Sequence, residues 1–152
     1  MTLWQLAYEL VTAFVGTVCF ALLFHVAPRH YLYCGLVGTC GWLVYCLMMA
    51  VEPSPVLASL VAVIPLTILT RVLAIVRKAP VTLFLIPGIF PLVPGAGIYY
   101  TAYAFIMGDT ATCAAKGAET LKIAVALAMG IALVVSFPLP AKIRVQKVNP
   151  SN

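Results

Sequence analysis

The sequence predicts an all-α integral membrane protein with about five transmembrane helices, the fourth of them broken by proline and glycine. Of the 152 residues, 64% are hydrophobic and only 9% are charged. A soluble domain carries about a quarter charged residues, because its surface must be hydrated. Long apolar runs separated by single or paired basic residues complete the pattern. The composition therefore excludes a soluble enzyme and a disordered tail.

The apolar runs divide the chain into five predicted spans. About 20 residues cross a bilayer as a helix, and each run is long enough. No basic segment precedes the first run, so its length favours a full span over a signal peptide. We expect one membrane domain over residues 1–152, with a short basic cytoplasmic tail at 139–152. The predicted spans cover residues 3–26, 31–51, 55–76, 81–107 and 112–138.

The charges within the runs are few. The first run contains Glu9, the second has no charge, and the third is interrupted only by Arg71 near its end. The fourth is uncharged, and the fifth confines its charges to the opening turns. We expect Arg71 to extend toward the cytoplasmic interface. His25 and His30, at the end of the first run, are expected at the interface rather than in a catalytic site.

The basic residues predict the orientation. Loops rich in Lys and Arg stay in the cytoplasm. On the opposite side the one basic residue counted is Lys116, just beyond the loop at 108–115. The N-terminus is therefore predicted outside and the C-terminus in the cytoplasm, as an odd number of spans allows. The basic residues on the predicted cytoplasmic side follow spans one and three or lie in the tail; they are Arg29, Arg77, Lys78, Lys142, Arg144 and Lys147.

Span four contains the segment that points most clearly to a function. Three prolines and three glycines lie within eleven residues there, and neither residue type supports a regular helix. Broken backbone at membrane depth is tolerated only when it is buried in protein or lines a wet cavity. Two half-helices are expected to meet at residues 91–97 as a hinge. The residues concerned are Pro87, Gly88, Pro91, Pro94, Gly95 and Gly97.

The second half-helix would begin near Gly95 and Gly97. Its first amides favour an anion such as a carboxylate, and transporters hold substrates at such breaks. Hydroxyls and ring faces follow, from Tyr99, Tyr100, Thr101 and Tyr103. The alternative is a proline-kinked structural helix with interfacial tyrosines.

Span two contains glycine at every third position, at Gly35, Gly38 and Gly41. Small residues let another helix approach closely, so we interpret them as a packing face. Two ionisable groups are possible sites of charge coupling. Glu9 is either a proton-coupling group or a solvated interfacial group. Lys122 lies deeper and could attract an anionic substrate. Asp109 is a plausible helix cap.

Other chemistry is not indicated. The five cysteines form no CxxC pair, so neither a metal nor a cofactor is expected. No hydrolase or nucleotide-binding motif occurs, no catalytic residue is assigned, and the prediction is that the protein is not an enzyme. No basic cluster is longer than Arg77-Lys78, which excludes nucleic acid as a partner.

The element Pro91-x-x-Pro94-Gly95, followed by Tyr99, resembles the signature of the threonine/serine exporter (ThrE) family. The segments 24–29 and 34–38 resemble the family's first loop and second span. More specifically, the chain resembles the small split subunit, which corresponds to the C-terminal membrane half. Gly97 and Tyr100 depart from the family pattern and leave the substrate open.

The resemblance implies a proton-driven secondary exporter of threonine and serine in the bacterial cytoplasmic membrane, surrounded by the lipid bilayer. It also implies a larger partner subunit that resembles the N-terminal half of the family. Some split relatives are associated with succinate, so export of dicarboxylates is an alternative. A membrane-embedded binding or assembly subunit without its own pathway is another.

Overall fold

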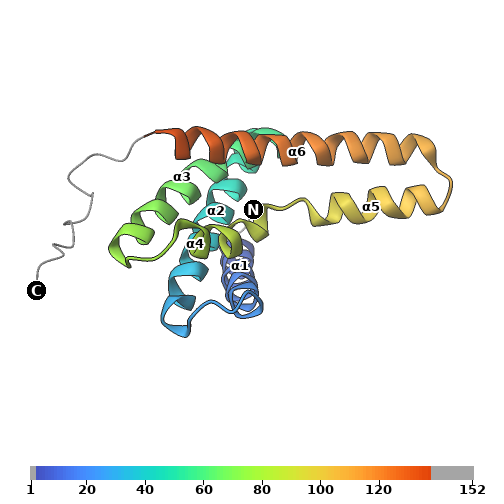
Figure 1. Cartoon of the computed structure of the whole chain (residues 1–152). Coiled ribbons are helices and arrows are strands. Elements are labelled where there is room, and N and C mark those ends of the chain that lie inside the picture. The colour runs from blue at the N-terminus through green and yellow to red at the C-terminus, as the bar shows by residue number, and fades with distance from the viewer. Residues whose placement is uncertain (1–2, 138–152) are drawn as a thin grey trace, which may run out of the picture.

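The computed structural model describes residues 3–137 (Figure 1). The predicted tail at 139–152 and the end of the fifth predicted span lie outside these residues. Every regular element between residues 3 and 137 is helical. The elements are α1 (Leu3–Leu23), η1 (Pro28–His30), α2 (Tyr31–Val51), α3 (Pro55–Val76), α4 (Val81–Ile89), η2 (Phe90–Leu92), α5 (Gly95–Ile106) and α6 (Thr110–Ser136).

Four of the helical segments are long and apolar enough to cross a bilayer by themselves: α1, η1 with α2, α3, and α6. A fifth candidate consists of α4 and η2 followed by α5, which meet at a bend of 56°. The all-α membrane class and the broken fourth span are therefore confirmed. Which side of the membrane each terminus faces stays a prediction.

The helices form a compact bundle and a projecting arm (Figure 1). Helices α1 to α4 pack together, and α3 also packs along α6. Helix α5 leaves the bundle and packs extensively only against α6. We call α5 and the part of α6 beside it the α5–α6 arm. The arm exists because the break turns the chain away from α4.

Helix α2 lies at the centre of the bundle, and its glycines set the distance to its neighbours. Because glycine has no side chain, the neighbouring helix occupies the space that a Cβ atom would fill. At each of the three positions, an added methyl group would overlap a side chain of α1 or α3. The pairs are Gly35 with Phe14, Gly38 with Thr17 and Gly41 with Leu66.

Polar groups satisfy both ends of α6. The Asp109 carboxylate accepts a hydrogen bond from the Thr112 amide at 3.0 Å, which caps the helix as predicted and lowers the pKa of Asp109. At the other end, the Arg71 guanidinium donates to the carbonyls of Val134 and Phe137, the latter at 2.8 Å. The structure thus uses Arg71 as a cap for the last carbonyls of α6.

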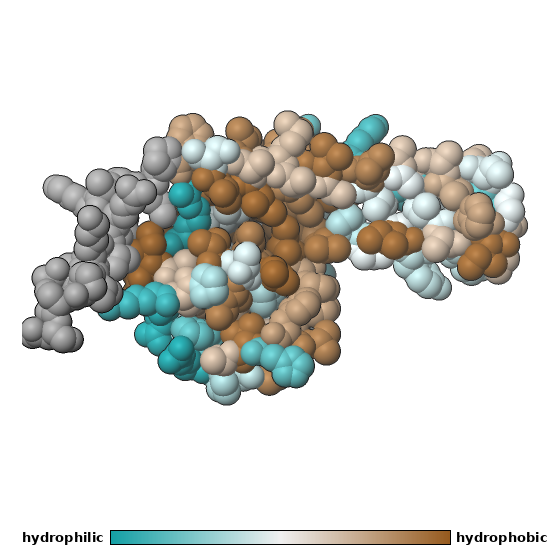
Figure 2. Space-filling model, viewed as in Figure 1, coloured by the Kyte–Doolittle hydropathy of each residue, from teal (hydrophilic) through white to brown (hydrophobic). Residues whose placement is uncertain are grey.

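The basic connections after α1 and after α3 come together at one end of the bundle. The Arg77 guanidinium lies 4.6 Å above the Tyr33 ring, and Arg29 Nε donates to His30 Nε2 at 3.1 Å. Hydrophilic residues gather at this end in the space-filling view (Figure 2). His30 lies at the same end of the bundle, and its depth in the membrane stays a prediction. Its side chain is only 2% exposed, and its ring packs nearly perpendicular to that of Phe84, with the centroids 5.4 Å apart.

Gly38→Ala tests the α1–α2 contact. The added methyl group would overlap both the hydroxyl and the carbon atoms of Thr17, which is fully buried. We expect the free energy of unfolding to fall by about 1–3 kcal/mol, as for other overpacked core positions. Reversible unfolding in detergent, followed by circular dichroism, measures this change.

The matched control is Gly16→Ala on the facing helix, where no heavy atom lies within 4 Å of the added methyl group. Because alanine favours a helix over glycine, this variant should be neutral or more stable by up to about 1 kcal/mol. Equal stability of the two variants would contradict the close contact at Gly38.

Candidate functional site

A cavity of about 300 Å³ lies between α1, α2 and η2. It extends along three turns of α1 and reaches the break in the fourth span. We call it the Glu9 cavity, because Glu9 supplies its one carboxylate. Its lining consists of Tyr8, Glu9, Thr12, Ala13, Gly16, Thr17, Phe20, Trp42, Phe90 and Pro91.

Aromatic contacts fix η2 against α1 at this cavity. The rings of Phe20 and Phe90 stack with their centroids 3.5 Å apart, and Phe24 meets Phe90 at 5.8 Å in a tilted arrangement. Small residues of α1, Ala13 and Gly16, leave the space beside these rings open. The broken span is therefore held to α1 by ring packing, with a cavity next to the contact.

The Glu9 carboxylate is bound by two side chains of α2. Its Oε2 atom accepts hydrogen bonds from Trp42 Nε1 at 3.3 Å and from Cys46 Sγ at 3.1 Å. Trp42 and Cys46 are one helical turn apart, so both face α1. Trp42 also stacks on Tyr45, with ring centroids 5.1 Å apart. These contacts hold the carboxylate at the cavity wall.

The break itself lies between Leu92, the last residue of η2, and Gly95, the first residue of α5. The Gly95 amide donates to the Val93 carbonyl at 2.7 Å, and no side chain caps α5. The first amides of a helix have no partner within it. The amides available to a ligand carboxylate are therefore those of Ala96 and Gly97, not that of Gly95.

The predicted hinge residues lie in different surroundings. Pro87 and Gly88 are buried, and Gly88 packs closely against Val37 of α2. Pro91 lines the Glu9 cavity. Pro94 precedes α5, and Gly95 has open space where its side chain would be. The structure therefore brings one of the three prolines into the cavity.

The residues beyond the break face α6 or the outside. Gly97 lies against Thr120, and Thr101 donates its hydroxyl to the Gly97 carbonyl at 2.7 Å. A second, more open cavity between α5 and α6 contains no charged group. It is lined by Ile98, Thr101, Ala102, Phe105, Ile106, Cys113, Gly117, Thr120, Leu121 and Ala124.

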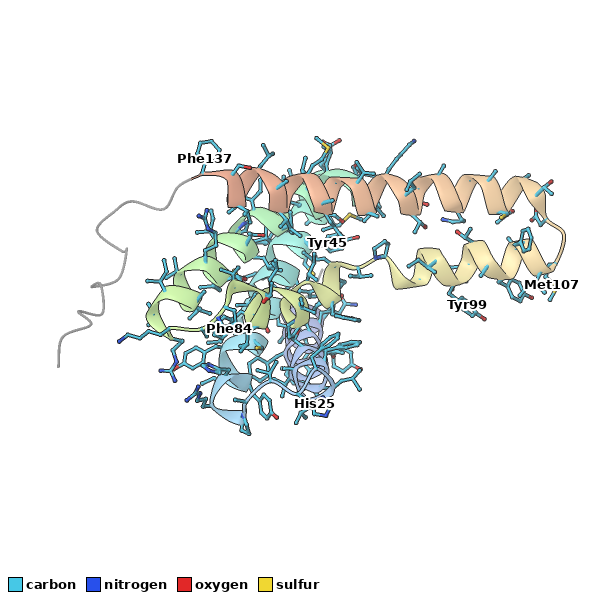
Figure 3. All side chains as sticks on the ribbon, in the orientation of Figure 1. His25, Tyr45, Phe84, Tyr99, Met107 and Phe137 are labelled. Carbon is cyan, nitrogen blue, oxygen red and sulfur yellow. The ribbon has the colours of Figure 1, made fainter. Side chains whose placement is uncertain are left out.

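The three tyrosines form an exposed cluster on the arm. Tyr99 lies 5.4 Å from Tyr100 and 6.3 Å from Tyr103, measured between ring centroids. Tyr99 is 63% exposed and points away from α6 (Figure 3). None of the three lines the Glu9 cavity or the cavity of the arm.

The two candidate coupling groups are separate. Glu9 lies in the cavity, whereas Lys122 is exposed on α6. Lys116 and Glu119, earlier on the same helix, form an exposed ion pair at 3.1 Å. Within residues 3–137, no group of three or more His, Cys, Asp or Glu residues could hold a metal ion.

Sequence reasoning missed the α2 side of the site. The sequence offers one signal, Trp42 and Cys46 four residues apart on an uncharged span. It contains nothing that pairs these residues with Glu9, which is 33 and 37 positions away. That pairing requires the tertiary structure.

Comparison with known proteins places the chain in a family. The family model described as "Threonine/Serine exporter, ThrE" matches residues 9–137, a range that contains Glu9, the break and all of α6. No curated protein and no solved structure matches the chain.

Glu9→Leu tests the hydrogen bonds that hold the carboxylate. Leucine leaves the Trp42 and Cys46 donors without their acceptor, and we expect a loss of about 1–3 kcal/mol in the free energy of unfolding. Glu9→Gln keeps a side-chain oxygen acceptor and should lose less. Thermal unfolding in the same detergent compares the two, and equal losses would contradict a role for these bonds in stability.

Proposed function

Since the chain belongs to the threonine/serine exporter family, we propose that it is the small membrane subunit of a proton-coupled secondary exporter of small hydrophilic metabolites. Threonine and serine are the proposed substrates, and the bacterial cytoplasmic membrane is the proposed location. One observation carries the proposal: the broken span meets a cavity that contains a carboxylate. Irregular backbone in a membrane protein lies where protein or water covers it.

The proposed mechanism is alternating access with the break as its hinge. Val93 and Pro94 separate two helical segments that already differ in direction by 56°. A change in that angle would move η2, and with it Phe90 and Pro91 at the cavity wall. Rotation about the break would thereby open and close the Glu9 cavity. The Ala96 and Gly97 amides would bind the substrate carboxylate.

The proton-coupling group is proposed to be Glu9, since an ionisable side chain inside a membrane bundle is a functional candidate. Lys122 is the second candidate, and its exposure on α6 fits a group that a partner covers. Tyr99, Tyr100, Thr101 and Tyr103 would line the path only in the assembled exporter, with the second subunit beside them.

The α5–α6 arm supports the proposal of a larger partner subunit. On α5 only Ala104 is buried, whereas Phe105 and Ile106 are 77% and 78% exposed. Polar groups share the arm with these side chains, including the exposed Lys116–Glu119 pair. Such a mixture suits a protein surface better than lipid alone, because hydrocarbon disfavours charge. We propose that the larger subunit packs here.

The first experiment measures export of labelled threonine, serine and succinate from cells that produce this chain alone, with its larger partner, or with neither. We expect threonine and serine export only when both subunits are present. Export of succinate instead would identify the dicarboxylate alternative. Absence of export with both subunits inserted would favour the binding or assembly subunit and contradict the proposal.

The double variant Pro94→Ala, Gly95→Ala tests the hinge. Alanine restores the missing amide and favours a continuous helix, so the two half-helices should straighten. We expect export by the assembled pair to fall about tenfold, which corresponds to an increase of about 1.4 kcal/mol in the barrier.

Pro55→Ala is the matched control, because Pro55 occupies the first turn of α3, where proline causes no break. Its export rate should equal that of the parent at equal membrane abundance. Unchanged export by the double variant would remove the break from the mechanism.

A further inference from the structure

We propose that the Glu9 cavity binds a primary ammonium group, the group that an amino acid has and a dicarboxylate lacks. The inference rests on the proposed function and names the part of the substrate that this cavity recognises. It assigns recognition of the ammonium group to α1 and α2, beside the proline–glycine break.

The first observation is the free oxygen of Glu9. Both hydrogen bonds that this carboxylate accepts, from Trp42 and from Cys46, end on Oε2. Within residues 3–137, Oε1 accepts no hydrogen bond. The two donors thus orient the carboxylate, and Oε1 stays available to an incoming N–H donor. A charge-assisted hydrogen bond from an ammonium group would occupy this oxygen.

The second observation is the aromatic character of the wall. Tyr8, Phe20, Trp42 and Phe90 all line the cavity that contains Glu9. A ring face attracts a cation through its quadrupole, most strongly for Trp and Tyr. A carboxylate surrounded by rings therefore favours an organic cation, which combines N–H donors with cation–π contacts.

The third observation is that the cavity has little to offer an anion. No Lys, Arg or His lines it. The hydroxyls of Thr12 and Thr17 donate to the carbonyls of Tyr8 and Ala13 at 2.8 Å, and the indole N–H of Trp42 donates to Glu9. These donors are already in use, and the charge of Glu9 repels a second carboxylate.

A metal cation suits this site less well than an ammonium group. Hard cations such as Ca²⁺ and Mg²⁺ take six or more oxygen ligands. The cavity offers one carboxylate, and its threonine hydroxyls face backbone carbonyls. An ammonium group needs few hydrogen-bond acceptors and is stabilised by cation–π contacts with the rings. The lining of the cavity therefore favours an ammonium group over a metal cation.

The specificity follows from these contacts. Threonine and serine can place their ammonium group at Glu9, while their carboxylate extends toward the break. Succinate would bring two negative charges to the same wall. The proposal therefore distinguishes the two substrate classes that the sequence left open.

The test uses the purified full chain in detergent with Trp4→Phe. The sequence has two tryptophans, so Trp42 becomes the only one and reports from the cavity wall. The probes are threonine methyl ester, which has the ammonium group but no carboxylate, N-acetylthreonine, which has the reverse, and succinate. Equilibrium dialysis with labelled probes runs in parallel, so binding is detected even without a change in fluorescence.

We expect saturable binding of threonine methyl ester and at least a tenfold increase in its Kd in Glu9→Gln, with recovery in Glu9→Asp. Glu52→Gln is the matched control, because Glu52 lies outside the cavity at the end of α2. Unfolding curves verify that Glu9→Gln is folded. Equal binding by Glu9→Gln, absence of binding by dialysis, or tighter binding of succinate would overturn the inference.

The outcome is separable from that of the proposed function. Threonine export that Glu9→Gln leaves unchanged would overturn both the ammonium site and the coupling role of Glu9, while the proposal of a threonine/serine exporter stands. Glu9-dependent binding of the methyl ester, without export of any amino acid by the assembled pair, would leave the ammonium site standing and overturn the exporter proposal.

Discussion

The close approach of α2 to its neighbours is the contact on which the site depends. Gly35 and Gly38 let α1 lie against the α2 backbone, and only at that distance can Glu9 reach Trp42 and Cys46. Helices in a membrane gain little from the hydrophobic effect against lipid, so close packing and hydrogen bonds hold them together. A larger side chain at Gly38 would separate the helices and take the donors away from the carboxylate. The bundle contact and the candidate binding site are therefore one feature.

The break in the fourth span has two consequences. It places Phe90 and Pro91 at the cavity, and it directs α5 out of the bundle along α6. A straight helix could do neither, since α5 would continue along the direction of α4. The same residues that end one helical segment thus provide a wall for the cavity and direct the chain into the α5–α6 arm, where we propose that a partner packs. The hinge that we propose would therefore touch both the cavity and the proposed subunit contact.

The charged side chains have two kinds of role, one in the fold and one at the candidate site. Arg71 and Asp109 complete the ends of α6, and Arg77 lies on an aromatic ring at the end of the bundle where Arg29 also lies. These groups serve the fold. Glu9 differs, because its carboxylate lines a cavity and both of its hydrogen bonds end on Oε2, which leaves Oε1 available to a ligand. In a chain with 4 acidic residues, that position distinguishes it as a functional candidate.

The sequence by itself determined the membrane class, the broken fourth span, the cap at Asp109 and the family, because each depends on local pattern: apolar length, proline and glycine spacing, or a short signature. It also singled out Glu9, though not what surrounds it. Only the tertiary structure decided that Glu9 meets Trp42 and Cys46, that His30 is buried, and that the tyrosines lie on an exposed arm. These facts depend on how the helices rotate and cross. Uniformly apolar helices have no polar face in their sequence that could fix this rotation, so side-chain packing decides it.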